Sequence, residues 1–294
     1  MIFSYLVCIV PLKFCHLVID AGTVDQFGVL HDGANPLAGA IDGVRLLKEK
    51  NKSIVILSNT SSRASTAVKK FIEMGFPPDI PFVTSGEIAW NYLGRSSIHR
   101  ILLVVKLSVL LDTHFRGKKC TWITWRRHAQ DNYLKSLQIQ LASVQEADFI
   151  FFHGTQTVVC DDSNPSTDMS TSVFSNGVMD EPLREVLSIA RARNIPAICA
   201  NMDLTAVLAN GRTAHMPGLL KALYEDMGGE VISFGKPQKE FFETAISIAS
   251  KALETSSTVN NVLFTKKLKS RTIHVGDSLH HDIQGMLLKS ALSL

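Results

Sequence analysis

The sequence lacks the features that mark several classes of protein. Its 294 residues include five cysteines, an odd number without a Cys-x-x-Cys pair, which argues against a disulfide scaffold or a zinc knuckle and favours a reducing compartment. The chain has no large excess of charge of either sign, because it contains 30 basic and 27 acidic residues, which give a formal net charge of +3. That balance does not indicate nucleic acid or a membrane surface as a partner. We therefore expect a cytoplasmic protein.

Long uninterrupted hydrophobic runs are also missing. Residues 1–19 are strongly apolar, but Pro11, Lys13 and His16 interrupt them, whereas a spanning helix needs about 20 apolar residues in a row. No basic start and no A-x-A cleavage pattern marks a secretory signal. We expect residues 1–19 to form a buried strand or a poorly ordered tail, and we leave organelle targeting or membrane association open. The shorter run at 101–111 is expected to be a buried strand or helix.

What is present is a regular alternation of expected strands and helices. The composition is that of a globular protein, with 46% apolar and 19% charged residues. The near-continuous apolar run at 53–57 is typical of a parallel strand that is covered on both faces. We expect strands at 21–24, 53–57, 82–84, 148–153, 195–200, 230–234 and 272–275, and helices at 38–50, 64–74, 216–227, 240–253 and from 281. This rhythm predicts an α/β fold with a doubly wound parallel sheet.

The middle of the chain is less regular than its two ends. The segment 163–177 is rich in Ser, Thr and Asn and is expected to be a loop. The simplest organisation is a core formed by residues 20–96 and 211–294, interrupted by an inserted domain at 97–210.

Polar residues gather where the expected strands end. Ligands bind at the carboxyl ends of the strands of an open parallel sheet. The residues expected there are Asp25, Ser58, Asn59, Lys236, Asp277 and, five residues further on, Asp282. Carboxylates bind Mg²⁺, while a hydroxyl and a lysine hold phosphate oxygens, and one carboxylate can act as a nucleophile. This set of groups is the one that phosphoryl transfer requires.

Four short motifs give the sequence a resemblance to the haloacid dehalogenase superfamily. They are DQFGVL at 25–30, LSNT at 57–60, GKP at 235–237 and GDSLHHDI at 276–283. Each motif is weak alone, but four in the right order, each at the end of an expected strand, are specific. The sequence is similar to subfamily IIA, in which a large cap lies between the second and third motifs. Within that subfamily it resembles a branch in which Trp or Phe precedes G-V-L-H-D-G. The resemblance implies a Rossmann-like core with an inserted α/β cap domain.

The resemblance also implies a role for each motif residue. Asp25 would be the nucleophile, Ser58 would bind the transferring phosphoryl group, and Lys236 would neutralise it. The Mg²⁺ ligands would be Asp25, the backbone carbonyl of Phe27, Asp277 and, directly or through water, Asp282. The phosphate and substrate contacts would be Ser58, Asn59 and Lys236, with Asn201 and Asp203 from a cap loop in which Met202 stands where proline is usual.

The expected function is therefore that of a Mg²⁺-dependent phosphatase. It would hydrolyse a small phosphorylated metabolite, a phosphomonoester, through an aspartyl-phosphate. We expect no nucleic-acid partner and no membrane partner, and we leave association into a homo-oligomer open.

Position 27 is the largest departure from the family pattern. Most phosphatases of the superfamily carry a second Asp there, which protonates the leaving group, and Phe27 cannot do so. The alternative is a catalytically weak or inactive protein that binds a phosphorylated ligand or a partner on the same fold. Candidates to replace the acid, by proximity in sequence, are His31, Asp32, His280 and His281.

Two further points concern the ends of the motif set. The run Leu17–Ile19 is a better strand than 21–24, and it would point at Asp20, in a pattern that resembles the phosphate loop of actin-like ATPases. We favour Asp25 because Gly28-Val29-Leu30 follows it and because the later motifs belong to the same family. The short stretch after the fourth motif predicts that part of the core surface is left uncovered.

Overall fold

The computed structural model describes residues 21–94, 115–126, 133–161, 163–164, 167–254 and 272–283. Contacts divide the chain into two compact units. The first falls within residues 1–58, 62–84 and 236–294, and the second within 59–61 and 85–235. The expectations for residues 1–19, for 101–111 and for the stretch after the fourth motif lie outside the described residues.

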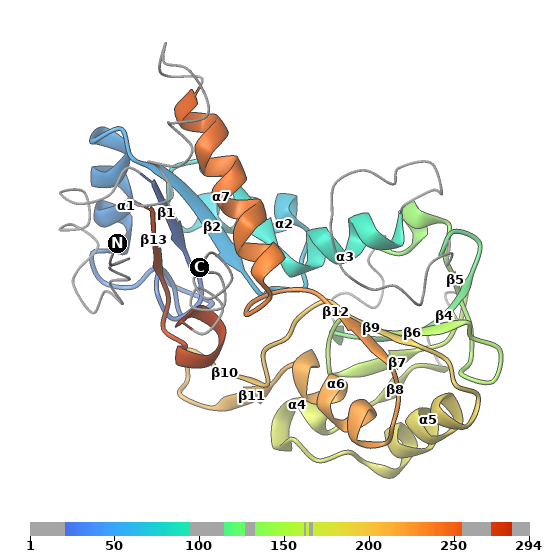
Figure 1. Ribbon diagram of the computed structural model, residues 1–294. Helices are drawn as coiled ribbons and strands as arrows, with labels where there is room; N and C mark the ends of the chain where they lie inside the picture. Colours follow the sequence, from blue (N-terminus) through green and yellow to red (C-terminus); the bar gives the residue numbers. More distant parts are fainter. Residues whose placement is uncertain are drawn as a thin grey trace. The chain divides into compact units, whose positions relative to one another are not determined.

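A parallel sheet of four strands forms the centre of the first unit, in the order β13-β1-β2-β3 (Figure 1). The strands are β1 (Ala21–Val24), β2 (Ser53–Ser58), β3 (Phe82–Thr84) and β13 (Thr272–Val275), and the helices are α1 (Ala40–Glu49), α2 (Ala64–Glu73) and α7 (Lys239–Glu254). Side chains of β2 alternate between the two faces, since successive residues of a strand point in opposite directions. Ile54 and Ile56 pack with Val44 of α1 and Phe71 of α2, while α7 packs on β1 and β2. The doubly wound parallel sheet is thereby confirmed.

The position of the strand β1 bears on which aspartate, Asp20 or Asp25, follows the first strand of the sheet. All four of its residues are buried, and it pairs in parallel with both β13 and β2. The chain therefore leaves the centre of the sheet at Asp25, as expected, whereas Asp20 lies outside the described residues. At the other end of the sheet, the helix expected from 281 begins as a π-helical turn at Leu279–Ile283, beyond which the chain is not described.

A second sheet, of seven strands, forms the centre of the second unit. Its order is β12-β9-β6-β4-β7-β8, with β5 beside β4. The strands are β4 (Lys119–Thr124), β5 (Gln140–Leu141), β6 (Phe149–Phe152), β7 (Thr157–Val159), β8 (Met169–Ser170), β9 (Ala197–Cys199) and β12 (Val231–Ser233), and β10 (Thr205–Val207) and β11 (Thr213–His215) form a separate hairpin. The helices are α3 (Ser85–Leu93), η3 (Lys135–Leu137), α4 (Val173–Asn176), α5 (Glu181–Ala192) and α6 (Pro217–Asp226). The segment 163–177, which we expected to be a loop, thus contains β8 and α4.

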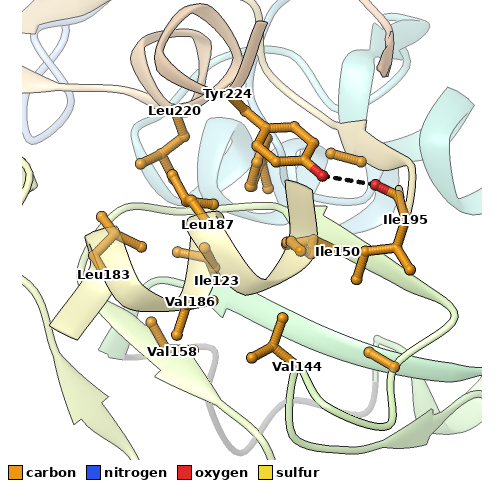
Figure 2. Close-up of a cluster of buried hydrophobic side chains, with 14 of the residues drawn as sticks. Ile123, Val144, Ile150, Val158, Leu183, Val186, Leu187, Ile195, Leu220 and Tyr224 are labelled. Carbon is orange, nitrogen blue, oxygen red and sulfur yellow. Dashed lines mark hydrogen bonds between the residues drawn. The ribbon is translucent and has the colours of Figure 1, made fainter. Parts of the chain in front are cut away.

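The core of the second unit packs α5 and α6 against this sheet. Figure 2 shows Leu187 and Leu220 against Ile123 and Ile150. The hydroxyl of Tyr224 is buried among these side chains and donates a hydrogen bond of 2.7 Å to the backbone carbonyl of Ile195. A buried polar group costs stability unless it is paired, so this bond lets a tyrosine serve as a core residue.

The second unit includes more of the chain than the insertion predicted at 97–210. The short strand β12 pairs in parallel with β9, so the chain up to Gly235 lies with the second sheet. At the other boundary, Ala89 and Leu93 of α3 pack in a cluster with Phe115 and Phe149. A run of apolar residues predicts that a strand or helix exists but not which sheet it joins, because that depends on contacts distant in sequence. The role of this unit as a cap stays a prediction. No helix within the described residues is long and apolar enough to cross a membrane.

Candidate functional site

The site in the first unit lies at the carboxyl edge of the parallel sheet. β1, β2 and β13 run in parallel, so their carboxyl ends meet at one edge, where Asp25 follows β1 and Asp277 lies just beyond β13. Ser58 is the last residue of β2. The backbone N–H of Asp25 donates to the carbonyl of Val275 at 2.8 Å, which extends the pairing into the site and holds Asp25 against the end of β13.

Lys236 is buried at the centre of this site, with a side-chain exposure of 2%. Its ammonium group lies 2.6 Å from Oδ2 of Asp25 and 2.7 Å from Oδ1 of Asp282. Removing a lysine from water is costly unless its charge is paired. The two carboxylates provide that pairing, so the ammonium group links the first motif to the fourth.

Asp282 is held from several directions and is fully buried. Its Oδ1 accepts a hydrogen bond of 2.7 Å from Nε2 of His274, and its Oδ2 accepts one of 2.9 Å from the backbone N–H of Ser278. Burial alone would raise the pKa of Asp282, but the hydrogen bond from His274 and the charge of Lys236 outweigh it and hold the pKa below its ordinary value. Asp282 is therefore ionised at neutral pH.

His274 connects this carboxylate to β1. Burial lowers the pKa of His274 despite the opposing charge of Asp282, so the ring is neutral at pH 7. Because an ionised carboxylate only accepts hydrogen bonds, Nε2 of the ring carries the proton. Nδ1 then accepts from the hydroxyl of Thr23, at 2.8 Å.

Three carboxylates at this edge could hold a metal ion. Oxygens of Asp25, Asp277 and Asp282 lie within 4.8 Å of one another. Carboxylates are hard oxygen ligands of the kind that a divalent cation such as Mg²⁺ prefers.

Gly28 makes room for the exposed member of this set. Its φ of +80° is one that other residues rarely adopt, and a Cβ there would lie 1.9 Å from Oδ2 of Asp277. A glycine at this position is therefore required both by the backbone and by the carboxylate beside it.

Gln26 links Ser58 to the first motif. Its buried side-chain amide donates to Oγ of Ser58 at 2.8 Å, and its backbone N–H donates to Oδ1 of Asp25 at the same distance. One residue thus orients both the proposed nucleophile and the hydroxyl on the neighbouring strand. The hydrogen of the Ser58 hydroxyl is directed away from Gln26, because its oxygen is the acceptor of that bond.

Polar side chains of the loop after Asp25 form hydrogen bonds with the backbone of the same loop. The ring of Phe27 lies edge-on to His31, with centroids 6.1 Å apart. Nδ1 of His31 accepts from the backbone N–H of Gly33 at 3.0 Å, and Oδ1 of Asp32 accepts from the backbone N–H groups of the two residues after Gly33. His31 and Asp32 therefore have structural roles. By contrast His281, another candidate acid, contacts the backbone carbonyl of Lys236 through Nδ1, at 3.2 Å.

Three of the predicted substrate residues meet in the second unit. The side-chain amide of Asn59 donates to Oδ1 of Asp203 at 2.8 Å, and Oδ1 of Asn201 accepts from the backbone N–H of Asp203 at 2.8 Å. Asn59 also accepts from the hydroxyl of Ser85 at 3.2 Å. The second motif therefore crosses from one unit to the other at the bond between Ser58 and Asn59.

Two site residues were missed by the sequence analysis. Gln26 and His274 both make buried contacts with predicted site residues. The available signal for His274 was a titratable residue between two apolar residues of a strand, just before the fourth motif. Gln26 gave a weaker signal, since only its position next to Asp25 distinguished it.

The chain resembles known proteins in family and in fold. Residues 23–113 match the model of the haloacid dehalogenase-like hydrolase family. Solved structures with the same fold include a haloacid dehalogenase-like hydrolase from Brucella suis, with a TM-score of 0.68, 21% identity, and coverage of 95% of this chain and 88% of that one. The resemblance inferred from the motifs is thereby confirmed for residues 23–113, which hold the first two of the four motifs, and the solved structures show the same fold.

Two further solved structures are described as phosphatases. A possible sugar phosphatase from Cytophaga hutchinsonii has a TM-score of 0.64 and 21% identity, with coverage of 95% of this chain and 84% of that one. A glycerol phosphate phosphatase from Mycobacterium tuberculosis, solved with calcium, has a TM-score of 0.55 and 16% identity, with coverage of 94% and 65%. At such identities the likeness shows the fold. No curated protein matches this chain.

Gly28→Ala tests the close approach of the loop to Asp277. Gly39→Ala is a matched control, because Gly39 has a similar φ of +75° but nothing within 4 Å of its Cβ position. The control should lose about 1 kcal/mol of unfolding free energy through backbone strain alone. Gly28→Ala should lose about 2 kcal/mol, because the carboxylate of the exposed Asp277 must also turn away. Urea unfolding of both variants measures the difference, and equal losses would contradict the contact.

The lowered pKa of His31 predicts that the free energy of unfolding depends on pH. Burial, followed by the charge of Lys70, lowers its pKa from 6.5 to about 4, against the smaller effect of Asp32. A histidine with a lowered folded pKa contributes stability that is present above pH 6.5 and is lost as the pH falls towards 4. Between about pH 7.5 and pH 5, this group should remove about 2 kcal/mol of unfolding free energy.

His31→Asn should reduce that pH dependence, since Asn keeps an acceptor for Gly33 but does not titrate. His280→Asn, at an exposed position, should leave it as in the wild type. Urea unfolding at several pH values is the measurement. The same slope in His31→Asn and the wild type would show that His31 does not account for it.

Proposed function

We propose that the chain is a Mg²⁺-dependent phosphatase that hydrolyses a small phosphomonoester through an aspartyl-phosphate on Asp25. The observation that carries this proposal is the buried ammonium group of Lys236, held between Asp25 and Asp282 at 2.6 and 2.7 Å. A cation in that position can offset the negative charge that develops as a phosphoryl group is transferred. The family match and the phosphatases among the proteins of similar fold point in the same direction.

The proposed chemistry proceeds in two displacements. A carboxylate oxygen of Asp25 attacks phosphorus, the bond from phosphorus to the leaving oxygen breaks, and that oxygen takes up a proton. Water then attacks the phosphorus of the aspartyl-phosphate, which releases inorganic phosphate and restores Asp25. Ser58, oriented by Gln26, donates to a phosphoryl oxygen, and Lys236 neutralises another.

A divalent metal would be held by Asp25 and Asp277, with the backbone carbonyl of Phe27 as a further ligand and Asp282 in support. When bound, it would withdraw charge from the phosphoryl oxygens. The chain's own contribution is to hold Asp25 in position, through the ammonium group of Lys236 and the backbone N–H of Gln26.

The proposed substrate is a small phosphorylated metabolite, and the proposed location is the cytoplasm. The described cysteines Cys120, Cys160 and Cys199 are free thiols, in agreement with a reducing compartment. Asn201 and Asp203 of the second unit are proposed to contact the substrate.

Phe27 supports a second candidate function. Its ring cannot protonate a leaving group, and general acid–base help is typically worth about 10²- to 10⁴-fold in rate. The alternative is therefore a protein that binds a phosphorylated ligand on the same fold and turns it over slowly or not at all.

Asp25→Asn tests the proposed nucleophile. A panel of phosphomonoesters is incubated with the full chain and Mg²⁺, and released phosphate is measured, with a chelator in parallel. Asp25→Asn should reduce turnover by about 10³-fold or more, because an amide is a poor nucleophile. Asp42→Asn, on the exposed face of α1, should have no effect. Equal activity in Asp25→Asn and the wild type would rule out the mechanism, and ligand binding without turnover in the wild type would favour the second candidate.

Phe27→Asp tests how much activity the missing acid costs. An Asp at this position should raise kcat by about 10-fold or more, because it would supply a proton to the leaving oxygen. Phe27→Leu is the matched control, since it removes the ring without adding an acid. The rates of both variants are compared on the same substrate. A similar change in both would mean that the chain already has another acid.

A further inference from the structure

We propose that His274 is a positioning residue that holds Asp282, and through it the ammonium group of Lys236, at the site of phosphoryl transfer. The inference rests on the proposed function. It begins from a chain of contacts that crosses the buried edge of the first unit. Thr23 donates to Nδ1 of His274 at 2.8 Å, Nε2 of His274 lies 2.7 Å from Oδ1 of Asp282, and that same oxygen lies 2.7 Å from the ammonium group of Lys236.

The contacts of Asp282 indicate that it anchors the side chain of Lys236. Both of its oxygens accept hydrogen bonds from the protein, Oδ1 from His274 and Lys236 and Oδ2 from the backbone N–H of Ser278. The side chain has an exposure of 0%, and a Cβ on Gly276 would lie 2.1 Å from its Cγ. A carboxylate held this closely is suited to anchor a lysine, whereas Asp25 and the exposed Asp277 are better placed to bind a cation.

His274 sets the direction in which Asp282 faces. The ring is 5% exposed and packs edge-on against Phe242 of α7, with centroids 5.1 Å apart. It is thus held by packing on one side and by Thr23 on another, so Nε2 has a defined position. Charge-assisted hydrogen bonds of this kind are directional and strong. Without the His274 donor, Asp282 could rotate, and the ammonium group of Lys236 would lose a partner of fixed position.

Two amide variants separate positioning from packing. In His274→Gln the side-chain amide reaches the place of Nε2 and can still donate to Asp282. In His274→Asn it reaches only the place of Nδ1, next to Thr23. Both variants put a polar amide in the same buried space, so their effects on folding should be similar.

The measurements are kcat, the affinity for orthovanadate with Mg²⁺ present, and the affinity for Mg²⁺ alone by calorimetry. Vanadate is the probe because it mimics the five-coordinate phosphorus of the transition state. His274→Asn should lower kcat and vanadate affinity by about 10-fold, as expected for a misplaced charge in the transition state. Its Mg²⁺ affinity should stay within about 3-fold of the wild type, and His274→Gln should be close to the wild type in all three measurements.

Three results would overturn the inference. They are equal losses in the two variants, wild-type behaviour in His274→Asn, or a loss of Mg²⁺ affinity as large as the loss of vanadate affinity. If His274→Asn does not fold, Thr23→Val takes over the test. It removes the hydroxyl that holds Nδ1, so the ring is placed less firmly, and vanadate affinity should fall by about 3-fold while Mg²⁺ affinity is kept. Unchanged vanadate affinity in Thr23→Val, or a loss in His274→Gln, would then overturn the inference. If the wild type has no phosphatase activity, the proposed function fails, while vanadate binding still tests the role of His274.

Discussion

The buried ammonium group of Lys236 is the constraint on which the site depends. A lysine with a side-chain exposure of 2% requires partners, and it has Asp25 after β1 and Asp282 in the turn after β13. These strands are neighbours in the parallel sheet. The register of the sheet therefore decides whether the charges meet, and a slip of one residue would turn the side chains of a strand to the opposite faces.

The parallel sheet brings residues of separate motifs to the same edge. Polar groups at a strand end are common, and each of the four motifs is weak alone. In a parallel sheet, however, the carboxyl ends of adjacent strands coincide, so residues at 25, 58 and 277 become neighbours. For this reason the parallel sheet, the order of its motifs and the candidate residues at its edge could be predicted from the sequence. The short strand β1 was predictable only through the motif that follows it, because four residues with little periodicity favour no register.

Other features could not be read from the sequence, for physical reasons. The strand β12 was expected in the core sheet, but it pairs with β9, and nothing in its three residues distinguishes one sheet from the other. The segment 169–176 forms β8, which pairs with β7, and α4, which packs with the distant strand β11. The roles of Gln26 and His274 depend on side-chain contacts across 32 and 8 residues of sequence. Such contacts arise from the folded geometry, so the local sequence does not say which partner each side chain meets.

The loop around Phe27 shows how a departure from a family pattern is to be interpreted. A ring at this position is supported by His31 and by Gly33, whose φ is +95° and whose Cβ position lies 2.9 Å from the ring. The loop is thus built around the phenyl group, with His31 held neutral by burial. The ring is therefore an integral part of this loop. Because a phenyl group carries no proton to donate, any acid that serves the leaving group in the wild type must come from another residue.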